Sequence, residues 1–273
     1  MTTNLCVVGS PIEHSLSPAL HAAAYKQLGL DFQYDKQEVF AGDLADFLDS
    51  RTYSGVSVTM PLKQEAFELA GSHDKHSIAT GVANTLFKAN GAWSAANTDV
   101  YGITQALNSV AAPKLTLIIG SGATARSALV ALANLFPETD IAIISRNESN
   151  GQERVAFAES LGFTAFARPA TSQVVLEADL VMSLVPVGSF TELWNEIAVD
   201  SKPKTGTLFD VAYNPWPSKA ALAWDNDRVI SGIEMLIWQA IEQVQLFVSS
   251  TGEDRKIDRD SLYRVMKGAV SAK

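Results

Sequence analysis

One strand–turn–helix–strand unit in the second half of the chain constrains the fold most strongly. A continuous apolar run, Leu115–Ile119, is followed by a glycine turn and then by Ala123–Phe136, which is rich in helix formers. Ile141–Ser145 is the next apolar run. A strand covered on both faces has such a continuous apolar run, and a helix between two strands indicates a βαβ unit. The chain is therefore predicted to be an α/β protein.

The glycine turn fits the pattern G-x-G-x-x-G/A. Gly120 permits a tight turn, Gly122 lets a pyrophosphate approach the backbone, and Ala125 keeps the third position small. The N-terminus of the following helix presents free N–H groups to phosphates. Any tight βα turn can use glycines, but the complete unit around this one favours a dinucleotide site. The predicted cofactor-binding turn comprises Gly120, Ser121, Gly122, Ala123, Thr124 and Ala125.

The end of the second strand indicates which dinucleotide is bound. NAD sites usually carry Asp or Glu there, whereas this chain has Ser145-Arg146-Asn147. Because the N–H donors of an arginine pair with phosphate oxygens, Arg146 favours NADP over NAD. The alternative is that Arg146 is an ordinary solvated surface residue. Arg126, in the first turn of the helix, either flanks the same region or is an exposed helix charge.

The rest of the chain alternates short apolar runs with helical segments. This order predicts an N-terminal α/β half over residues 1–103 and a second half over 104–231, while periodicity leaves the terminal helices unassigned. The expected strands are Leu5–Gly9, Gln33–Phe40, Gly55–Thr59, Leu180–Val185 and Thr207–Val211. The expected helices include Ser17–Leu28 with Ser17 as N-cap, Asp43–Asp49, Met235–Ser249 and Ser261–Val270.

Charge and cysteine content exclude several classes of protein. The formal charge is −9, from 21 Lys and Arg against 30 Asp and Glu. Nonspecific binding of nucleic acid or an anionic membrane needs a basic face, so both partners are excluded. Cys6 is the single cysteine, which rules out an intramolecular disulfide and a Cys-rich zinc site. The N-terminus lacks the pattern of a signal peptide, so we expect a reduced, cytoplasmic protein.

Polar residues follow several predicted strands, where α/β ligand sites lie. Lys63 comes just after one strand, and Asp99 comes after another in an Asn-Thr-Asp segment that could equally form an Asx turn. Two loop serines, Ser15 and Ser17, could hold a carboxylate. His73 and His76 are spaced as on a helix but lack a ligand set, so no metal is predicted.

Seven short segments, taken in order, resemble the shikimate dehydrogenase family over most of the chain. No single segment would be specific, but their combination is. They are Gly9-Ser-Pro-Ile-x-His14-Ser-x-Ser17-Pro18-x-x-His21, Val58-Thr-x-Pro-x-Lys63, Asn84-Thr85, Asn97-Thr98-Asp99-x-x-Gly102, the glycine turn, Asp210-x-x-Tyr213-x-Pro215 and Gly232-x-x-Met235-Leu236-x-x-Gln239-Ala240.

The resemblance implies a substrate domain over residues 1–103 and 232–273 and a Rossmann-like NADP-binding domain over 104–231. It also implies NADPH-dependent reduction of 3-dehydroshikimate to shikimate in aromatic amino-acid biosynthesis, and the reverse oxidation. Lys63 and Asp99 match the family's catalytic pair. The other residues it implies are Ser15 and Ser17 for the substrate carboxylate, Thr59, Asn84, Tyr213 and Gln239 for the rest of the substrate site, and Gly232 for the cofactor.

Two alternatives stay open. The first is an NAD-dependent quinate/shikimate dehydrogenase, which Ser17 and Arg146 disfavour because NAD-using relatives tend to carry an acidic residue near position 146. The second is a non-catalytic dinucleotide sensor of the same fold, which the joint presence of Lys63 and Asp99 disfavours. A homodimer is one assembly that the resemblance allows.

Overall fold

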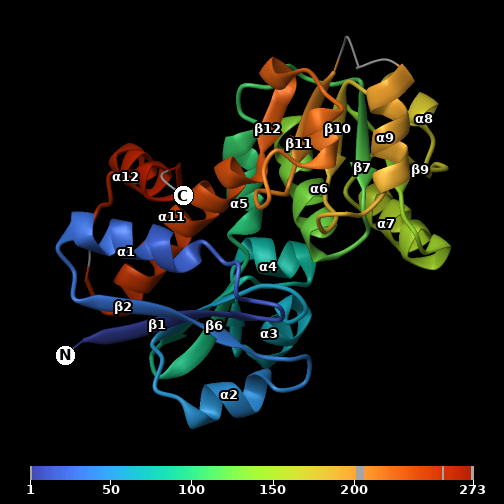
Figure 1. Ribbon diagram of the computed structural model, residues 1–273. Helices are drawn as coiled ribbons and strands as arrows, with labels where there is room; N and C mark the ends of the chain where they lie inside the picture. The colour runs from blue at the N-terminus through green and yellow to red at the C-terminus, as the bar shows by residue number, and fades with distance from the viewer. Residues whose placement is uncertain (1, 201–205, 254, 272–273) are drawn as a thin grey trace. The chain divides into compact units, whose positions relative to one another are not determined.

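The computed structural model describes residues 2–200, 206–253 and 255–271. The chain divides into two compact units, one comprising Met1–Gly102 and Ile237–Lys273 and the other Ile103–Leu236 (Figure 1). Within the described residues, each unit is built on a six-stranded sheet. Two helices contain the boundaries between the units, α5 (Asp99–Ala106) and α11 (Gly232–Ser250).

The sheet of the first unit is mixed, with the strand order β2-β1-β3-β5-β6-β4. β5 pairs antiparallel with both β3 and β6, and β5 and β6 form a hairpin that the expected strands above do not include. Asn90 and Gly91 form the turn with positive φ angles, and an Asn-Gly pair is a strong hairpin signal. The strands are β1 (Thr3–Gly9), β2 (Phe32–Glu38), β3 (Gly55–Val58), β4 (Ser72–His73), β5 (Thr85–Ala89) and β6 (Ala92–Ala96).

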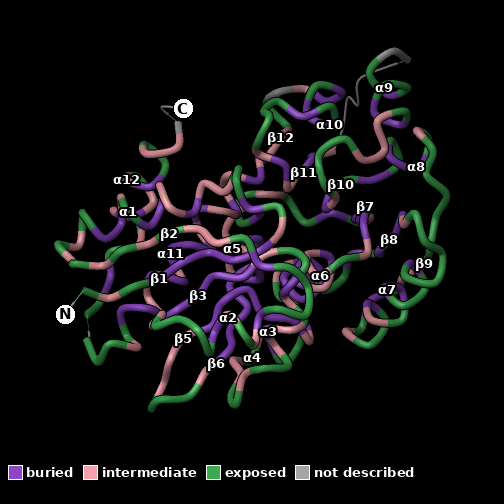
Figure 2. Tube along the Cα trace, turned by 60° about the horizontal axis from the view of Figure 1, so that its bottom comes forward, coloured by how far each residue is buried: buried purple, intermediate pink, exposed green. Residues whose placement is uncertain are grey.

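Both faces of this sheet are covered, and its central strands β1 and β3 are buried (Figure 2). Cys6 and Val8 of β1 pack with Leu44 and Leu62 in one apolar cluster. On the other face, α1 packs on β1 and β2, and Phe247 of α11 lies against Gly55. The helices are α1 (Ser17–Leu28), α2 (Leu44–Ser50), α3 (Lys63–Leu69), α4 (Lys75–Thr80) and α12 (Arg259–Ser271).

The predicted N-cap of α1 is wrong by one residue. The helix begins at Ser17, and Leu16 is the N-cap without a side-chain hydrogen bond. Ser17 does not cap because its side chain is buried and contacts the Tyr34 hydroxyl instead. Gly29 ends the helix in the left-handed conformation.

The sheet of the second unit is wholly parallel, with the order β12-β11-β10-β7-β8-β9, which is the strand order of a Rossmann fold. The predicted βαβ unit is present as β7, α6 and β8, and β7 lies at the centre of the sheet beside β10. The strands are β7 (Leu115–Ile119), β8 (Asp140–Ile144), β9 (Ala165–Ala167), β10 (Leu180–Ser183), β11 (Thr207–Asp210) and β12 (Val229–Ser231).

Helices flank these strands, and one apolar cluster joins the sheet to α8, α9 and α10. Leu117 and Ile144 from the strands pack there with Val175, Trp194 and Trp224 from the helical side. The helices are α6 (Ala123–Leu135), α7 (Glu148–Ser160), α8 (Ser172–Glu177), α9 (Thr191–Asp200), α10 (Lys219–Leu222) and the short η1 (Asn226–Arg228).

Candidate active site

Lys63 and Asp99 meet in the first unit although they are 36 positions apart. Lys63 is the first residue of α3, and Asp99 is the first residue of α5. The Lys63 Nζ donates to Asp99 Oδ2 at 2.5 Å, and the two side chains are only 13% and 6% exposed. Because little water reaches them, their electrostatic interaction is screened less than that of a surface ion pair. The pair can therefore hold or move a proton at a defined place.

Asn84 fixes the other oxygen of the same carboxylate. Its Nδ2 donates to Asp99 Oδ1 at 2.8 Å, while its Oδ1 accepts from the Thr98 N–H at 2.8 Å. A backbone N–H can only donate, so the amide oxygen must face Thr98 and the nitrogen must face Asp99. Asp99 is thereby held from both sides, by Lys63 and by Asn84.

Gln239 of α11 joins this cluster from the C-terminal part of the chain. Its Oε1 lies 3.1 Å from Asn84 Nδ2 and 3.3 Å from Thr98 Oγ1. The side chain is buried, at 6% exposure. Four residues implied by the resemblance, namely Lys63, Asn84, Asp99 and Gln239, thus form one contiguous cluster.

The two serines predicted for the substrate carboxylate lie together at the start of α1. Ser15 Oγ accepts from the Ser17 N–H at 3.3 Å. Ser15 is half-buried and Ser17 is buried. Thr59, just past the end of β3, is also half-buried, and its N–H donates to the Val8 carbonyl at 2.9 Å. Ser15 and Thr59 lie in the loops that follow β1 and β3, and Ser17 is the first residue of α1.

A buried hydrogen-bond network that the motifs do not indicate leads from Ser17 to Asn84. Tyr34, which contacts Ser17, donates to Ser57 Oγ at 2.6 Å, and Ser57 donates to Gln243 Oε1 at 2.9 Å. The Gln243 Nε2 then donates to the Asn84 carbonyl at 3.2 Å. The four elements β2, β3, β5 and α11 contribute to the network or adjoin it, so no local sequence pattern could reveal it.

His21 is the buried centre of this network. Its ring stacks on Tyr34 at 3.9 Å between centroids, and its nitrogens meet Tyr25 Oη at 2.9 Å and Gln243 Oε1 at 3.3 Å. Gln243 uses its amide nitrogen elsewhere, so it accepts from His21 Nε2–H, and Nδ1 accepts from Tyr25. Complete burial lowers the pKa of His21 to about 3, which keeps the ring neutral. The motif contains this histidine, but its spacing gives no role for it.

In the second unit, the glycine turn leaves room for a ligand. Gly120 has a φ of +121°, and a Cβ there would lie 2.9 Å from the Leu184 carbonyl oxygen, so this position requires glycine. Gly122 differs, because a Cβ built on it would meet no atom within 4 Å. It is exposed, and no side chain caps the N-terminus of α6 behind it. Uncapped N–H groups facing open space fit a pyrophosphate.

The turn contacts the loop after β8, which carries the predicted NADP determinant. Ser121 Oγ and Ser145 Oγ lie 2.9 Å apart. Arg146 is exposed, whereas Asn147 is the N-cap of α7, its side chain accepting from the Asn150 N–H. Asn147 therefore has a structural role in addition to any contact with a cofactor.

Three further residues that the sequence analysis assigns to the cofactor site also make packing contacts within the protein. Ala125 is buried, which allows α6 to pack closely on the sheet. A Cβ on Gly232 would lie 2.0 Å from the Val211 carbonyl oxygen, so close packing requires a glycine at this position. Arg126 is half-buried, with its guanidinium 5.6 Å above the centre of the Phe157 ring.

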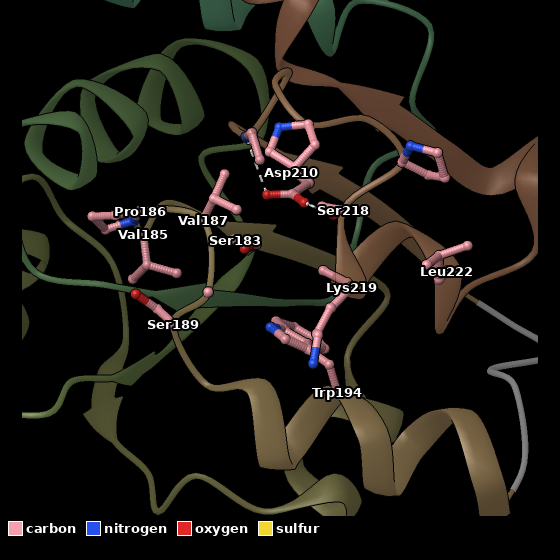
Figure 3. Close-up of a pocket in the computed structure, with 15 residues that line it drawn as sticks. Ser183, Val185, Pro186, Val187, Ser189, Trp194, Asp210, Ser218, Lys219 and Leu222 are labelled. Atoms are coloured by element: carbon pink, nitrogen blue, oxygen red, sulfur yellow. Dashed lines mark hydrogen bonds between the residues drawn. The ribbon is translucent and has the colours of Figure 1, made fainter. Parts of the chain in front are cut away.

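A pocket of about 190 Å³ opens in the second unit, beside the end of β10 (Figure 3). Asp210 lies in its wall and accepts a short hydrogen bond from Ser218, and that serine caps α10 by accepting from the Ala221 N–H. Burial raises the pKa of Asp210. The aspartate of the Asp-x-x-Tyr segment thus anchors a helix, while Tyr213 is half-buried in the connection after β11.

None of the helices in the described part of the chain combines the length and apolarity that crossing a bilayer requires. No group of three His, Cys, Asp or Glu side chains among the described residues could hold a metal ion.

Known proteins are similar to this chain over nearly its whole length. Residues 7–86 match the shikimate dehydrogenase substrate binding domain. Shikimate dehydrogenase (NADP(+)) of Bartonella quintana is 32% identical, over 95% of this chain and 92% of its own length. The solved structure of Mycobacterium tuberculosis shikimate dehydrogenase superposes with a TM-score of 0.85, at 33% identity, over 99% of this chain and 100% of its own.

A second solved structure extends the comparison. Shikimate 5-dehydrogenase of Thermus thermophilus, in complex with NADP(H) and shikimate, superposes with a TM-score of 0.78 at 25% identity, over 98% of this chain and 100% of its own. The sequence identity and the shared fold agree on one assignment. This chain belongs to the shikimate dehydrogenase family.

Proposed function

We propose that this chain is an NADP-dependent shikimate dehydrogenase, which reduces 3-dehydroshikimate to shikimate in aromatic amino-acid biosynthesis and catalyses the reverse oxidation. The observation that carries the proposal is the buried contact between Lys63 and Asp99, held in place by Asn84. The names of the similar proteins supply the substrate and the cofactor.

The Lys63–Asp99 pair carries the proton of the reaction. When a ring hydroxyl is oxidised, its O–H proton must leave as the carbon loses hydride, so a group within hydrogen-bond reach must take it. In the ionised state Lys63 donates to and stabilises a developing alkoxide, and in the neutral state it takes the proton itself. Asp99 orients Lys63 and is the other candidate for the proton. Bound NADP⁺ supplies the hydride acceptor.

Neutral hydroxyls and amides hold the substrate. The adjacent Ser15 and Ser17 bind its carboxylate, which explains how a chain of charge −9 accommodates an acid. Hydroxyl donors bind an anion without the desolvation that a buried cation requires. The ring hydroxyls and the rest of the substrate are assigned to Thr59, Asn84 and Gln239, together with Tyr213.

The glycine turn holds the cofactor pyrophosphate. The open space before Gly122 and the uncapped N-terminus of α6 support this assignment. Arg146, exposed beside the turn, binds the 2′-phosphate. We assign the cofactor to the residues from Gly120 to Arg126, to 145–147 and to Gly232.

Steady-state kinetics with four pairs, shikimate or quinate with NADP⁺ or NAD⁺, test this function. We expect the highest kcat/KM for shikimate with NADP⁺. A clear preference for quinate with NAD⁺ would assign the chain to the NAD-dependent alternative. Cofactor binding without turnover on any pair would identify a dinucleotide sensor.

We also propose a cytoplasmic enzyme, consistent with Cys6 as the single cysteine of the chain and with its burial as a free thiol. Homodimer formation stays a prediction. Analytical ultracentrifugation across a concentration series tests it directly, because the measured mass of a dimer is twice the protomer mass of 29.3 kDa.

A further inference from the structure

Gln243 of α11 is a buried glutamine that uses its full hydrogen-bonding capacity. The side chain is only 2% exposed. Its Oε1 accepts from Ser57 Oγ at 2.9 Å and from His21 Nε2 at 3.3 Å. Its Nε2 donates to the Asn84 carbonyl at 3.2 Å and to Thr85 Oγ1 at 3.0 Å. A side-chain amide accepts two hydrogen bonds and donates two, so all four places are filled.

The orientation of Gln243 determines that of a neighbouring hydroxyl. The Asn84 carbonyl can only accept, so Gln243 must turn its nitrogen, and not its oxygen, toward Asn84 and Thr85. The Thr85 hydroxyl therefore accepts from Gln243 and directs its own proton to Asn84 Oδ1, which lies 2.9 Å away. Each group along this path has one direction, so the orientation of Gln243 is passed on to the Asn84 amide.

The Asn84 amide belongs to the candidate active site. With its oxygen held by Thr85, its nitrogen faces Asp99 Oδ1 at 2.8 Å, and Asp99 accepts from Lys63. Gln239, one turn earlier on α11, lies 3.1 Å from the same Asn84 nitrogen. Residues one turn apart lie on the same face of a helix, so two glutamines of α11 hold Asn84 together.

Gln243 is also connected to the serines at the start of α1. The Tyr34 hydroxyl contacts Ser17 and donates to Ser57 Oγ at 2.6 Å, and Ser57 donates to Gln243. Ser17 and Asp99 are assigned to opposite ends of the substrate, Ser17 to its carboxylate and Asp99 to the reacting hydroxyl. The connections from both ends meet at Gln243.

We infer that Gln243 is a positioning residue of the reaction, which acts through Thr85 and Asn84 on the Lys63–Asp99 pair and through Ser57 on the carboxylate end of the site. The inference rests on the proposed function. Proton and hydride transfer require closely matched positions, and a misplacement of about 1 Å can lower a rate by about 10²-fold. Loss of the Gln243 amide should therefore change catalysis although the catalytic pair itself is intact.

Steady-state kinetics with shikimate and saturating NADP⁺, well below each melting temperature, separate the two connections. Thr85→Val should lower kcat by about tenfold or more and change the KM for shikimate by less than about twofold. Ser57→Ala should raise that KM by about threefold or more and change kcat by less than about twofold. Gln243→Met, which removes the amide at similar volume, should change both constants. The double variant with Thr85→Val should have a kcat within about twofold of Gln243→Met alone, because both residues act along one path.

Gln245→Met is the matched control. Gln245 lies on the same helix, is half-buried, and donates to Ser249 Oγ at 3.1 Å. Both kinetic constants of this variant should equal those of the parent. Thr85→Val keeps the shape of a strand residue, so it tests the inference even if Gln243→Met does not fold.

NMR of the substrate-free protein tests the positioning step without turnover. The side-chain amide protons of Asn84, identified by their loss in Asn84→Asp, should exchange with water at least about tenfold faster in Gln243→Met than in the parent. In Gln245→Met they should exchange at the parental rate. A parent that oxidises neither shikimate nor quinate would contradict the proposed function, while this exchange rate would still decide whether Gln243 holds Asn84.

Three results would overturn the inference. The first is a folded Gln243→Met variant with parental kinetics and parental exchange at Asn84. The second is an equal loss of activity in Gln245→Met, which would attribute the effect to α11 in general. The third is an equal change of kcat and KM in Thr85→Val and in Ser57→Ala, which would indicate loosening of the whole unit instead of two separate connections.

Discussion

Lys63 and Asp99 each occupy the first position of a helix, and their side chains meet at 2.5 Å. The helix dipole favours the carboxylate of Asp99 at the N-terminus of α5 and disfavours the ammonium of Lys63 at the N-terminus of α3. The carboxylate therefore offsets an unfavourable position for the lysine, and Asn84 keeps the carboxylate in place. This arrangement concentrates the acid–base capacity of the site in one pair.

Lys63→Ala should lower kcat by about 10²–10⁴-fold with little change in the KM for shikimate, because we assign the lysine to the reacting hydroxyl and the two serines to the carboxylate. Lys75→Ala is the matched control, since Lys75 is also the first residue of a helix but is exposed. Near-normal turnover of Lys63→Ala in steady-state assays would refute the assigned role.

Gly122→Ala should separate folding from cofactor binding. The backbone of Gly122 is extended and a Cβ meets no atom within 4 Å, so the melting temperature should stay within a degree or two of the parent. The methyl group would occupy space assigned to the pyrophosphate, so we expect the KM for NADP⁺ to rise by about tenfold or more. Calorimetric titration with NADP⁺ checks this directly.

Gly120, two residues before Gly122, should respond to the same substitution by losing stability. Gly120→Ala should destabilise the protein by about 1–3 kcal/mol, because its φ of +121° and the Leu184 carbonyl both exclude a Cβ. Thermal unfolding measures this difference. A Gly122→Ala variant that binds NADP⁺ as the parent does would show that the cofactor does not approach that backbone.

Arg146→Ala should raise the KM for NADP⁺ far more than the KM for NAD⁺, since its exposed guanidinium is assigned to the 2′-phosphate. Arg168→Ala, exposed in the same unit, should affect neither constant. Kinetics at constant ionic strength measure both values. Equal changes for the two cofactors would exclude a contact between Arg146 and the 2′-phosphate.

His21 should make stability fall at acid pH. Its pKa is 6.5 in an unfolded chain and about 3 in the folded protein, so below pH 6.5 the unfolded state gains a proton that the folded state does not. The contribution of neutral His21 to the free energy of unfolding is fully present above pH 6.5. It is lost as the pH falls toward 3, at up to about 1.4 kcal/mol per pH unit.

Urea unfolding from pH 8 to pH 4 measures this effect. His21→Gln should reduce the slope of stability against pH below 6.5 by about one proton, whereas His14→Gln, at an exposed position, should leave it near that of the parent. An unchanged slope in His21→Gln would mean that the buried ring does take up a proton in the folded state.

Local features of the chain were enough to predict the Rossmann-type unit. The apolar run Leu115–Ile119, the glycines after it and the helix-forming segment are local features, and each requires the same strand–turn–helix path. The residues of the Lys63–Asp99 pair could also be identified from short segments. Even the missed hairpin carried a local signal at Asn90 and Gly91.

The contacts among these side chains could not be predicted in this way, because they depend on the packing of distant segments. Asn84 and Gln239 are 155 positions apart, and the orientation of the Asn84 amide follows from a backbone N–H that no motif contains. The same holds for Gln243, a residue that looks in sequence like an ordinary polar residue of a helix but is buried between His21 and Asn84. Burial and hydrogen-bond partners depend on packing between distant segments, and a local pattern does not encode them.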